Sequence, residues 1–205
     1  MLDTTAFFLI GSNLSVDFIN TEIVENGAPK DLLASLAEFA AWAAATNVLD
    51  RAKAERLVAA WGSESETAAV IAHIQTFRSI LRDMITGLAQ GASVKATAIH
   101  AINAELQNKN SAVEIRQTES GFDKLFRADF TEPRQLLAPI AESAADLLCY
   151  GDLTYLKKCE NAECILYFYD TTKNHSRRWC SMAGCGNRAK VAAFYQRQRE
   201  KAKKL

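Results

Sequence analysis

The sequence predicts a mainly α-helical protein: an N-terminal helical bundle that carries a small β-hairpin, followed by a small cysteine-rich module. Three observations lead to this prediction. Apolar residues recur every three or four positions over most of residues 1–110, which is the period of an amphipathic helix. The period changes to two between Ser111 and Phe130, as in a half-buried strand pair. Four of the five cysteines fall within residues 159–185.

Four helices are expected in the first part of the chain. Their apolar stripes can be buried only against one another, which favours a bundle. Polar residues that can cap a helix, and glycines that can stop one, suggest the boundaries. The helices are expected from the candidate N-cap Asp31 to Asn47, from the candidate N-cap Asp50 to Gly62, from about Ser65 to Gln90, and onward from the candidate N-cap Ser93.

A hairpin and a further helix are expected after these. Val113 and Ile115 alternate with charged residues, and the hairpin should turn near Ser120–Gly121. A helix is predicted from about Pro133 to Tyr150, with a kink or a late start because Pro139 lacks a backbone donor. The chain is therefore expected to divide into a helical domain, residues 1–150, and a C-terminal module, residues 151–205.

The chain contains no apolar run of the length that a membrane-spanning helix needs, about 20 residues. The apolar stretch Ala6–Ile10 is short and is preceded by Asp3 instead of a basic leader, so a secretory signal is not expected. We therefore expect a cytoplasmic protein without a membrane contact.

The zero net charge hides an asymmetry. Residues 1–156 contain 12 Lys and Arg against 20 Asp and Glu, whereas residues 157–205 contain 12 against 4. A basic segment of this kind is typical of a contact with nucleic acid or another polyanion. A solvated basic tail that binds nothing specific is the alternative, and charge alone leaves both open.

The cysteines are spaced as two pairs, with four residues inside each pair and fifteen between the pairs. Two such pairs can grip opposite sides of a tetrahedral zinc ion, and the intervening Ile165–Tyr169 segment fits a strand. We expect one structural Zn²⁺ because four protein thiolates leave no open position for catalysis. Cys149 is expected to be a small core residue instead of a ligand. The predicted ligands are Cys159, Cys164, Cys180 and Cys185.

Two stretches resemble known families. The segment Ser176–Met182 and the motif Cys185–Arg188 resemble the CGNR zinc finger over nearly all of residues 156–200, although Thr172–Lys173 stands where Ser-Arg is usual. The segment Leu14–Thr21 is similar to the opening of a domain called ABATE, which precedes this finger in a bacterial family. The resemblance implies a treble-clef-like finger, with a strand and loop followed by a basic helix. It also implies a stress-induced transcription regulator whose finger contacts DNA.

The final helix is expected from about Asn187 to Lys204, with an apolar stripe of Val191, Phe194 and Tyr195 packed on the zinc unit. Arg and Lys on such a helix can neutralise phosphates and contact guanines in the major groove. Asn187 could instead cap the helix, and Arg188 could pair with Asp170. The candidate nucleic-acid contacts are Lys173, Arg177, Arg178, Arg188, Lys190, Arg197, Lys201 and Lys204.

The leading functional hypothesis is a DNA-binding transcription regulator whose N-terminal domain senses a signal or dimerises. An RNA- or ribosome-associated stress factor is the alternative, with Tyr167 and Tyr169 as the aromatics placed for base stacking. No phosphate-binding loop or nucleophile motif is present in residues 1–156, so we do not expect an enzyme. Asp17, Asn20 and Thr21 are expected to cap and anchor the first helix. The sequence does not identify an effector, and a homodimer is possible.

Overall fold

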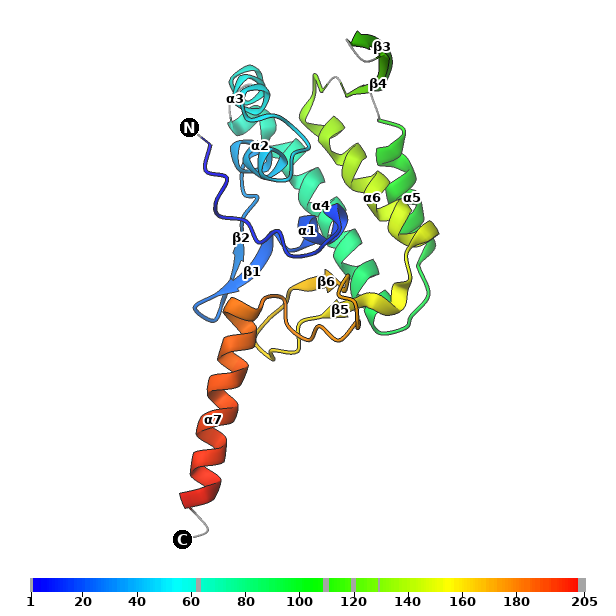
Figure 1. Cartoon of the computed structure of the whole chain (residues 1–205). Coiled ribbons are helices and arrows are strands. Elements are labelled where there is room, and N and C mark those ends of the chain that lie inside the picture. The colour runs from blue at the N-terminus through cyan, green and yellow to red at the C-terminus, as the bar shows by residue number, and fades with distance from the viewer. Residues whose placement is uncertain (1, 62–63, 109–110, 119–120, 129, 203–205) are drawn as a thin grey trace.

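The structure is a computed structural model that describes residues 2–61, 64–108, 111–118, 121–128 and 130–202. Helices α1 to α6 form the bundle, the cysteine-rich module lies against one end of it, and α7 extends away from both (Figure 1). The predicted fold class is confirmed. The helices are α1 (Leu14–Ile19), α2 (Leu36–Ala45), α3 (Arg51–Ala60), α4 (Glu64–Ala89), α5 (Ala96–Leu106), α6 (Leu137–Tyr150) and α7 (Asn187–Ala202). The strands are β1 (Glu22–Glu25), β2 (Ala28–Asp31), β3 (Ser111–Thr118), β4 (Gly121–Ala128), β5 (Leu156–Lys158) and β6 (Tyr167–Tyr169).

The long helix α4 is the centre of the bundle, and α1, α2 and α5 pack against it. Its buried stripe includes Ile74, Leu81 and Ile85, which are fully inaccessible to solvent. Phe18 of α1 meets Trp42 of α2 with ring centroids 5.4 Å apart. Each such side chain contributes about 1.5–3 kcal/mol by leaving water, so this apolar cluster holds the bundle together.

The predicted start of α2 is wrong. Helix α2 begins at Leu36 instead of following Asp31, because Ser35 caps it: the Ser35 hydroxyl accepts from the Glu38 amide at 3.2 Å. The Glu38 carboxylate in turn accepts from the Ala34 amide at 2.7 Å, which is close to a capping box. Asp31 is the last residue of strand β2, and its carboxylate binds an arginine of α4, as described below.

Of the other predicted helix boundaries, some agree with the structure and some do not. Asp50 caps α3 as predicted and accepts from the Lys53 amide at 2.7 Å, but the predicted stop at Gly62 lies outside the described residues. Helix α4 is close to its predicted range. Ser93 does not cap α5, which begins at Ala96 without a side-chain cap.

A hairpin that the sequence reasoning missed connects α1 to α2. Strands β1 and β2 pair antiparallel around Asn26 and Gly27, whose φ angles are 54° and 80°. Positive φ at both central residues is the geometry of the type I′ turn, which Asn-Gly adopts readily. This hairpin lies at the side of the molecule, next to the junction of the bundle and the cysteine-rich module (Figure 1).

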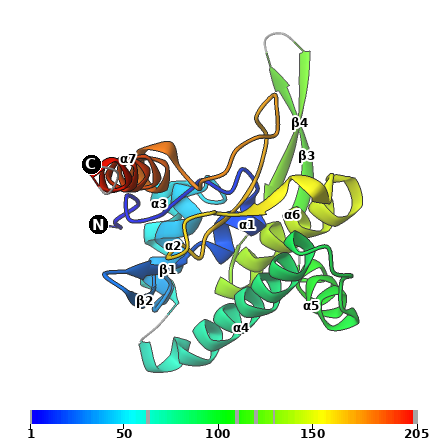
Figure 2. The ribbon, with the colours of Figure 1, turned by 90° about the horizontal axis from the view of Figure 1, so that it is seen from below.

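The predicted second hairpin and late helix start are confirmed. Strands β3 and β4 pair antiparallel and extend away from the helices (Figure 2), and Ser120 of the expected turn lies outside the described residues. A 3-10 turn, Pro133–Leu136, precedes α6, which starts at Leu137. Pro139 therefore lies in the first turn, where its missing amide leaves no helical hydrogen bond broken.

Cys149 is exposed, and its assignment to the core is wrong. The buried face of α6 ends with Leu147, and the step of two residues to Cys149 turns about 200° around the helix axis. None of the helices among the described residues combines the length and the apolar character needed to cross a membrane.

The C-terminal module shares its core with the bundle. Strand β5 pairs antiparallel with β6, and buried Leu156 and Tyr167 of these strands belong to the same apolar cluster as the helices. Conversely, Ile23 of β1 and Leu32, just after β2, pack in the cluster that contains the four cysteines. The module is therefore completed by residues from the N-terminal part of the chain.

Candidate metal centre and basic helix

Two tight turns position the four predicted ligands. Cys159 follows β5, and the turn that Cys164 closes is held by its amide, which donates to the Asn161 carbonyl oxygen at 2.9 Å. Cys180 precedes a second turn and Cys185 lies within it, and the Ser181 hydroxyl at its start accepts from the Gly184 amide at 3.0 Å. This second turn, Met182–Gly186, leads directly into α7.

The turns bring the four cysteines together. Their sulfur atoms all lie within 4.8 Å of one another, and all four residues are buried. The Cys164 and Cys180 sulfur atoms are 3.8 Å apart. A tetrahedral zinc ion with Zn–S bonds of about 2.3 Å has sulfur–sulfur edges of about 3.8 Å, so the donor set and its size fit this ion. The cluster can hold a metal ion, as the spacing predicts.

Donor groups around the sulfurs complete the site. The Cys180 amide donates to the Cys159 sulfur at 3.3 Å, and the Asn161 side-chain amide donates to the Cys185 sulfur at 3.4 Å. The Arg188 guanidinium donates to the Cys185 sulfur at 3.0 Å, and this contact raises the pKa of Arg188. Four thiolates around a divalent ion carry two excess negative charges, which these donors offset.

The thiols are unequal before metal binds. Hydrogen bonding from Cys180 lowers the pKa of the Cys164 thiol to about 5, although burial opposes this shift. The same hydrogen bond raises the pKa of Cys180, since that thiol is the donor. Burial raises the pKa of Cys159. Cysteine binds a metal ion as the thiolate, so metal binding to this cluster releases the protons that its thiols carry.

Buried Asp170 organises the loop between the cysteine pairs, and the predicted Arg188–Asp170 pair is wrong. The Asp170 carboxylate accepts from the Lys157 ammonium at 2.8 Å, the Thr172 hydroxyl at 2.6 Å and the Arg177 amide at 2.9 Å. These bonds keep the pKa of Asp170 well below its usual range despite its burial. Its acceptor positions are filled, and Arg188 turns to sulfur instead.

Arg177 is a structural residue in this fold. Its guanidinium lies 4.1 Å from the centre of the Phe168 ring and donates to the Ile10 carbonyl oxygen at 3.0 Å. It also donates to the carbonyl oxygens of Trp179 and Cys180. These bonds use the Nε and one terminal nitrogen of the guanidinium, and a nucleic-acid contact by Arg177 stays a prediction.

Arg178 and Lys173 are exposed beside an open hollow of about 420 Å³ in the loop. Arg178 pairs with Glu160 at 2.6 Å and lies 5.0 Å from the centre of the Trp179 ring. Met182, on the same hollow, is 53% exposed. Unlike Arg177, these two cations can reach a polyanion without the loss of a buried contact.

The cations of α7 are exposed, but the apolar stripe is not packed as predicted. Arg188, Lys190 and Arg197 all reach solvent, whereas the side chain of Lys201 and all of Lys204 lie outside the described residues. Val191, Phe194 and Tyr195 are 55%, 51% and 61% exposed, so they do not cover the zinc unit. Only the first turn of the helix touches the module, because α7 leaves it in a straight line (Figure 1).

The N-terminal motif joins the module to the bundle. The Asn20 side chain donates to the Tyr167 carbonyl oxygen at 2.8 Å and accepts from the Tyr167 amide at 2.9 Å. Asn20 is also the C-cap of α1, so the expected anchoring role extends beyond that helix. The Tyr169 amide donates to the Gly11 carbonyl oxygen at 2.8 Å, and the Asp17 carboxylate accepts from the Gly11 amide at 2.7 Å. A side chain on residue 11 would clash with Asp17, so this close approach requires glycine.

Two family models match the chain. Residues 155–198 match the CGNR zinc finger. Residues 12–151, more than half of the chain, match the model named ABATE, which is described as "Putative stress-induced transcription regulator". The chain belongs to the ABATE family. A search of curated proteins finds no match.

Within the ABATE region, the sequence reasoning missed two arginines of α4. Buried Arg78 donates to both carboxylate oxygens of Asp31, at 2.7 and 2.6 Å, and to the Thr21 hydroxyl at 2.9 Å. Arg82 pairs with Glu22 at 2.7 Å and donates to the Ile165 carbonyl oxygen at 3.4 Å. The helical period places both arginines near the apolar stripe of α4. This position in the sequence was the signal that could have indicated a buried role for them. Through them the ABATE domain holds its hairpin and reaches the CGNR finger.

Proposed function

We propose that this protein is a DNA-binding transcription regulator in which one structural Zn²⁺ shapes the finger that presents α7 to DNA. The observation that carries the proposal is the exposure of this helix. Every residue from 190 to 200 is exposed. This stretch belongs to residues 157–205, which contain 12 Lys and Arg against 4 Asp and Glu. An unpacked, basic helix at the end of a rigid module is suited to enter a groove of DNA.

The dimensions of α7 agree with this role. Its 16 residues span about 24 Å at 1.5 Å per residue. The major groove, about 12 Å wide, admits an α-helix. The bound zinc ion would cross-link the two cysteine turns, and the second of these turns sets the direction in which α7 leaves the finger.

Different cations take different parts in the proposed contact. Lys190 and Arg197 are separated by two helical turns and share a face, so they are placed for phosphates or base edges along one groove. Lys173 and Arg178 add phosphate contacts from the loop. Arg188 is assigned a structural role at Cys185, because its guanidinium is bonded to a metal ligand.

Salt-dependent binding tests the assignment. Fluorescence anisotropy with a duplex DNA pool should give a logarithmic salt slope that becomes shallower by about one in Lys190→Ala and in Arg197→Ala. Lys95→Ala removes an exposed cation at the start of α5, outside the finger, and should leave the slope unchanged. Binding that does not depend on salt, or equal effects of all three substitutions, would contradict the proposal.

Zinc content separates structural from contact residues. Elemental analysis of the reduced protein should find one zinc per chain. Arg188→Ala should reduce zinc retention against a chelator, whereas Lys190→Ala should leave it unchanged. If Arg188→Ala retains zinc normally but loses DNA affinity, Arg188 is a contact instead.

Binding to RNA is the second candidate function. The two tyrosines first considered for stacking are not free to do so: Tyr167 is 5% exposed, and the Tyr169 hydroxyl accepts from the Asp152 amide at 3.0 Å. Phe194 and Tyr195 on α7 are exposed instead, and exposed aromatics are typical of single-strand recognition. Competition of duplex DNA against single-stranded and structured RNA decides between the two. In either case we propose a binding role and not a catalytic one.

A further inference from the structure

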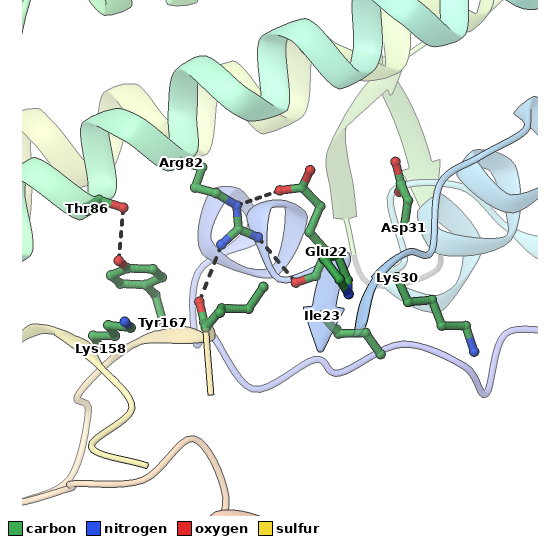
Figure 3. A pocket seen from close by; sticks show the side chains of 10 residues that line it. Glu22, Ile23, Lys30, Asp31, Arg82, Thr86, Lys158 and Tyr167 are labelled. Atoms are coloured by element: carbon green, nitrogen blue, oxygen red, sulfur yellow. Dashed lines mark hydrogen bonds and ion pairs between the residues drawn. The ribbon is translucent and has the colours of Figure 1, made fainter. Parts of the chain in front are cut away.

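An open pocket of about 560 Å³ lies where the ABATE domain meets the finger (Figure 3). Three separate parts of the chain line it. The β1–β2 hairpin forms one side, Arg82 and Thr86 of α4 form the roof, and Lys158, Ile165 and Tyr167 of the finger close the other side. The volume is within the usual range for small-molecule sites, about 300–1,000 Å³, and junctions between domains are a common place for them.

The carboxylates of the pocket are already neutralised. Asp31 is paired with buried Arg78 at 2.6 Å, and Glu22 is paired with Arg82 at 2.7 Å. These two pairs contain equal numbers of positive and negative charges. The pocket therefore gains no net negative charge from its acidic residues, which argues against a cation as the ligand.

One positive charge at the pocket is left over. Lys30 pairs with Glu25 outside the pocket at 2.8 Å. Lys158 is exposed, and among the residues that the structure describes its ammonium group has no ion-pair or hydrogen-bond partner. The backbone at Lys158 is held in place, because Lys158 is paired with Tyr167 in the β5–β6 ladder.

The remaining lining is suited to an apolar body. Ile23, Pro29 and Ile165 contribute aliphatic surface next to the Tyr167 ring. The Tyr167 hydroxyl is hydrogen-bonded to the Thr86 hydroxyl at 2.9 Å, which fixes the ring in the wall (Figure 3). Apolar walls with one unpaired cation at the rim are complementary to an amphipathic organic acid.

We propose that this pocket binds a small organic anion, a carboxylic acid with an apolar body, whose carboxylate pairs with Lys158. The proposal deepens the sensing role given above to the ABATE domain, and only its effect on DNA rests on the proposed function. It places the ligand at the border with the finger, whereas the sequence suggested only that the N-terminal domain senses a signal or dimerises.

Such a ligand would bridge both parts of the protein. Lys158 directly precedes the metal ligand Cys159, and Ile165 directly follows Cys164. Ile23, on the opposite wall, packs in the same apolar cluster as the four cysteines. A ligand that contacts both walls stabilises the docked finger by the free energy of binding, and this changes the population of finger orientations available to DNA.

The first test measures binding directly, without DNA. Benzoate and indole-3-acetate are titrated into the zinc-loaded full chain by calorimetry and ligand-observed NMR, with benzamide and indole-3-acetamide as neutral counterparts. Ligands of this size are expected to bind with Kd on the order of 1 mM. The acids should bind at least about tenfold more tightly than the amides, as expected for a carboxylate paired with Lys158.

Charge substitutions locate the site. Lys158→Gln should weaken binding of the acids about tenfold, whereas Lys173→Gln, at another exposed lysine of the finger, should have no effect. Lys158→Glu should abolish binding of benzoate and create binding of benzylamine, which shows that the pocket is still folded. No binding of either acid at about 10 mM, equal binding of acids and amides, or equal affinities of the wild type and Lys158→Gln would overturn the proposal.

A second measurement separates this proposal from the proposed function. DNA anisotropy is repeated with and without saturating indole-3-acetate. A change of DNA affinity that disappears in Lys158→Gln supports the coupling, and an unchanged affinity overturns it. If the protein binds the acids but no nucleic acid, the proposed function fails while the pocket assignment stands.

Discussion

The link between Asn20 and Tyr167 offers the sharpest test of how the finger is attached. Asn20 is 1% exposed, and its amide group bonds to both the amide and the carbonyl oxygen of Tyr167. The side chain thereby replaces the neighbouring strand that β6 lacks on this edge. We predict that Asn20→Ala destabilises the bundle and the finger together.

The magnitude follows from the two backbone groups that lose their partner. A buried polar group left without a hydrogen bond costs about 1–3 kcal/mol, so the pair costs about 2–6 kcal/mol. Water can enter part of the space that the side chain leaves and bond to these groups. We therefore expect a loss of about 3 kcal/mol in the free energy of unfolding. This is below the usual free energy of unfolding of a domain, about 5–15 kcal/mol, so the variant should still fold.

Two probes of one urea titration measure the effect. Circular dichroism follows the helices, and a chromogenic chelator follows zinc release. Both transitions should shift to lower urea by the same free energy and with unchanged slope. The control Asn103→Ala, on the exposed face of α5, should change stability by less than about 0.5 kcal/mol. A loss below about 1 kcal/mol, or a shift confined to zinc release, would refute the coupling through Asn20.

Three further predictions concern charge and metal. Burial raises the pKa of Asp17 to about 6, so the folded protein retains a proton that the unfolded chain loses. Stability should therefore fall by up to about 3 kcal/mol between pH 4 and pH 6, and chemical unfolding of Asp17→Asn across this range should show a smaller decline. Asp31→Ala leaves the buried guanidinium of Arg78 without its main partner, and urea unfolding should show a loss of about 3–5 kcal/mol in the free energy of unfolding. The control Glu25→Ala, at the exposed end of the same hairpin, should lower it by less than about 1 kcal/mol. Removal of zinc by a chelator should lower the melting temperature of the helices as well as that of the finger, and helices that melt unchanged would show that the shared core contributes little.

The sequence predicted the parts of this protein whose causes are local. The cysteine spacing alone predicted a cluster that the structure brings within 4.8 Å, because a short loop leaves little freedom in how each pair can turn. Helix α4 was predicted nearly to its ends, because its apolar stripe from Val70 to Leu88 continues for about five turns. The Asn26–Gly27 turn and the Ser35–Glu38 capping pattern were equally local signals, and they were missed because Asp31 was taken as the cap of α2.

The features that the sequence did not predict depend on contacts between distant residues. The partner of Arg177 at Ile10 is separated from it by 167 positions, so nothing near Arg177 in the sequence indicates this contact. Val191 and Phe194 repeat at a helical spacing that usually indicates a buried face, but α7 leaves the module after its first turn. The direction of a helix is set by the turn that precedes it, and local periodicity does not contain that information.

The shared core changes how a signal can pass from one part of the protein to the other. A finger tethered only by a linker would move independently of the helices, and a ligand on the ABATE domain would have no differential contact with it. Here Asn20 and Gly11 bond to the finger strand β6, and Ile23 packs among the cysteines. Any rearrangement of the β1–β2 hairpin therefore alters the support of the metal centre and, through the turn at Cys185, the direction of α7. A binding event in the pocket beside Lys158 acts on the hairpin and the finger at once, which is the physical requirement for coupling between the two.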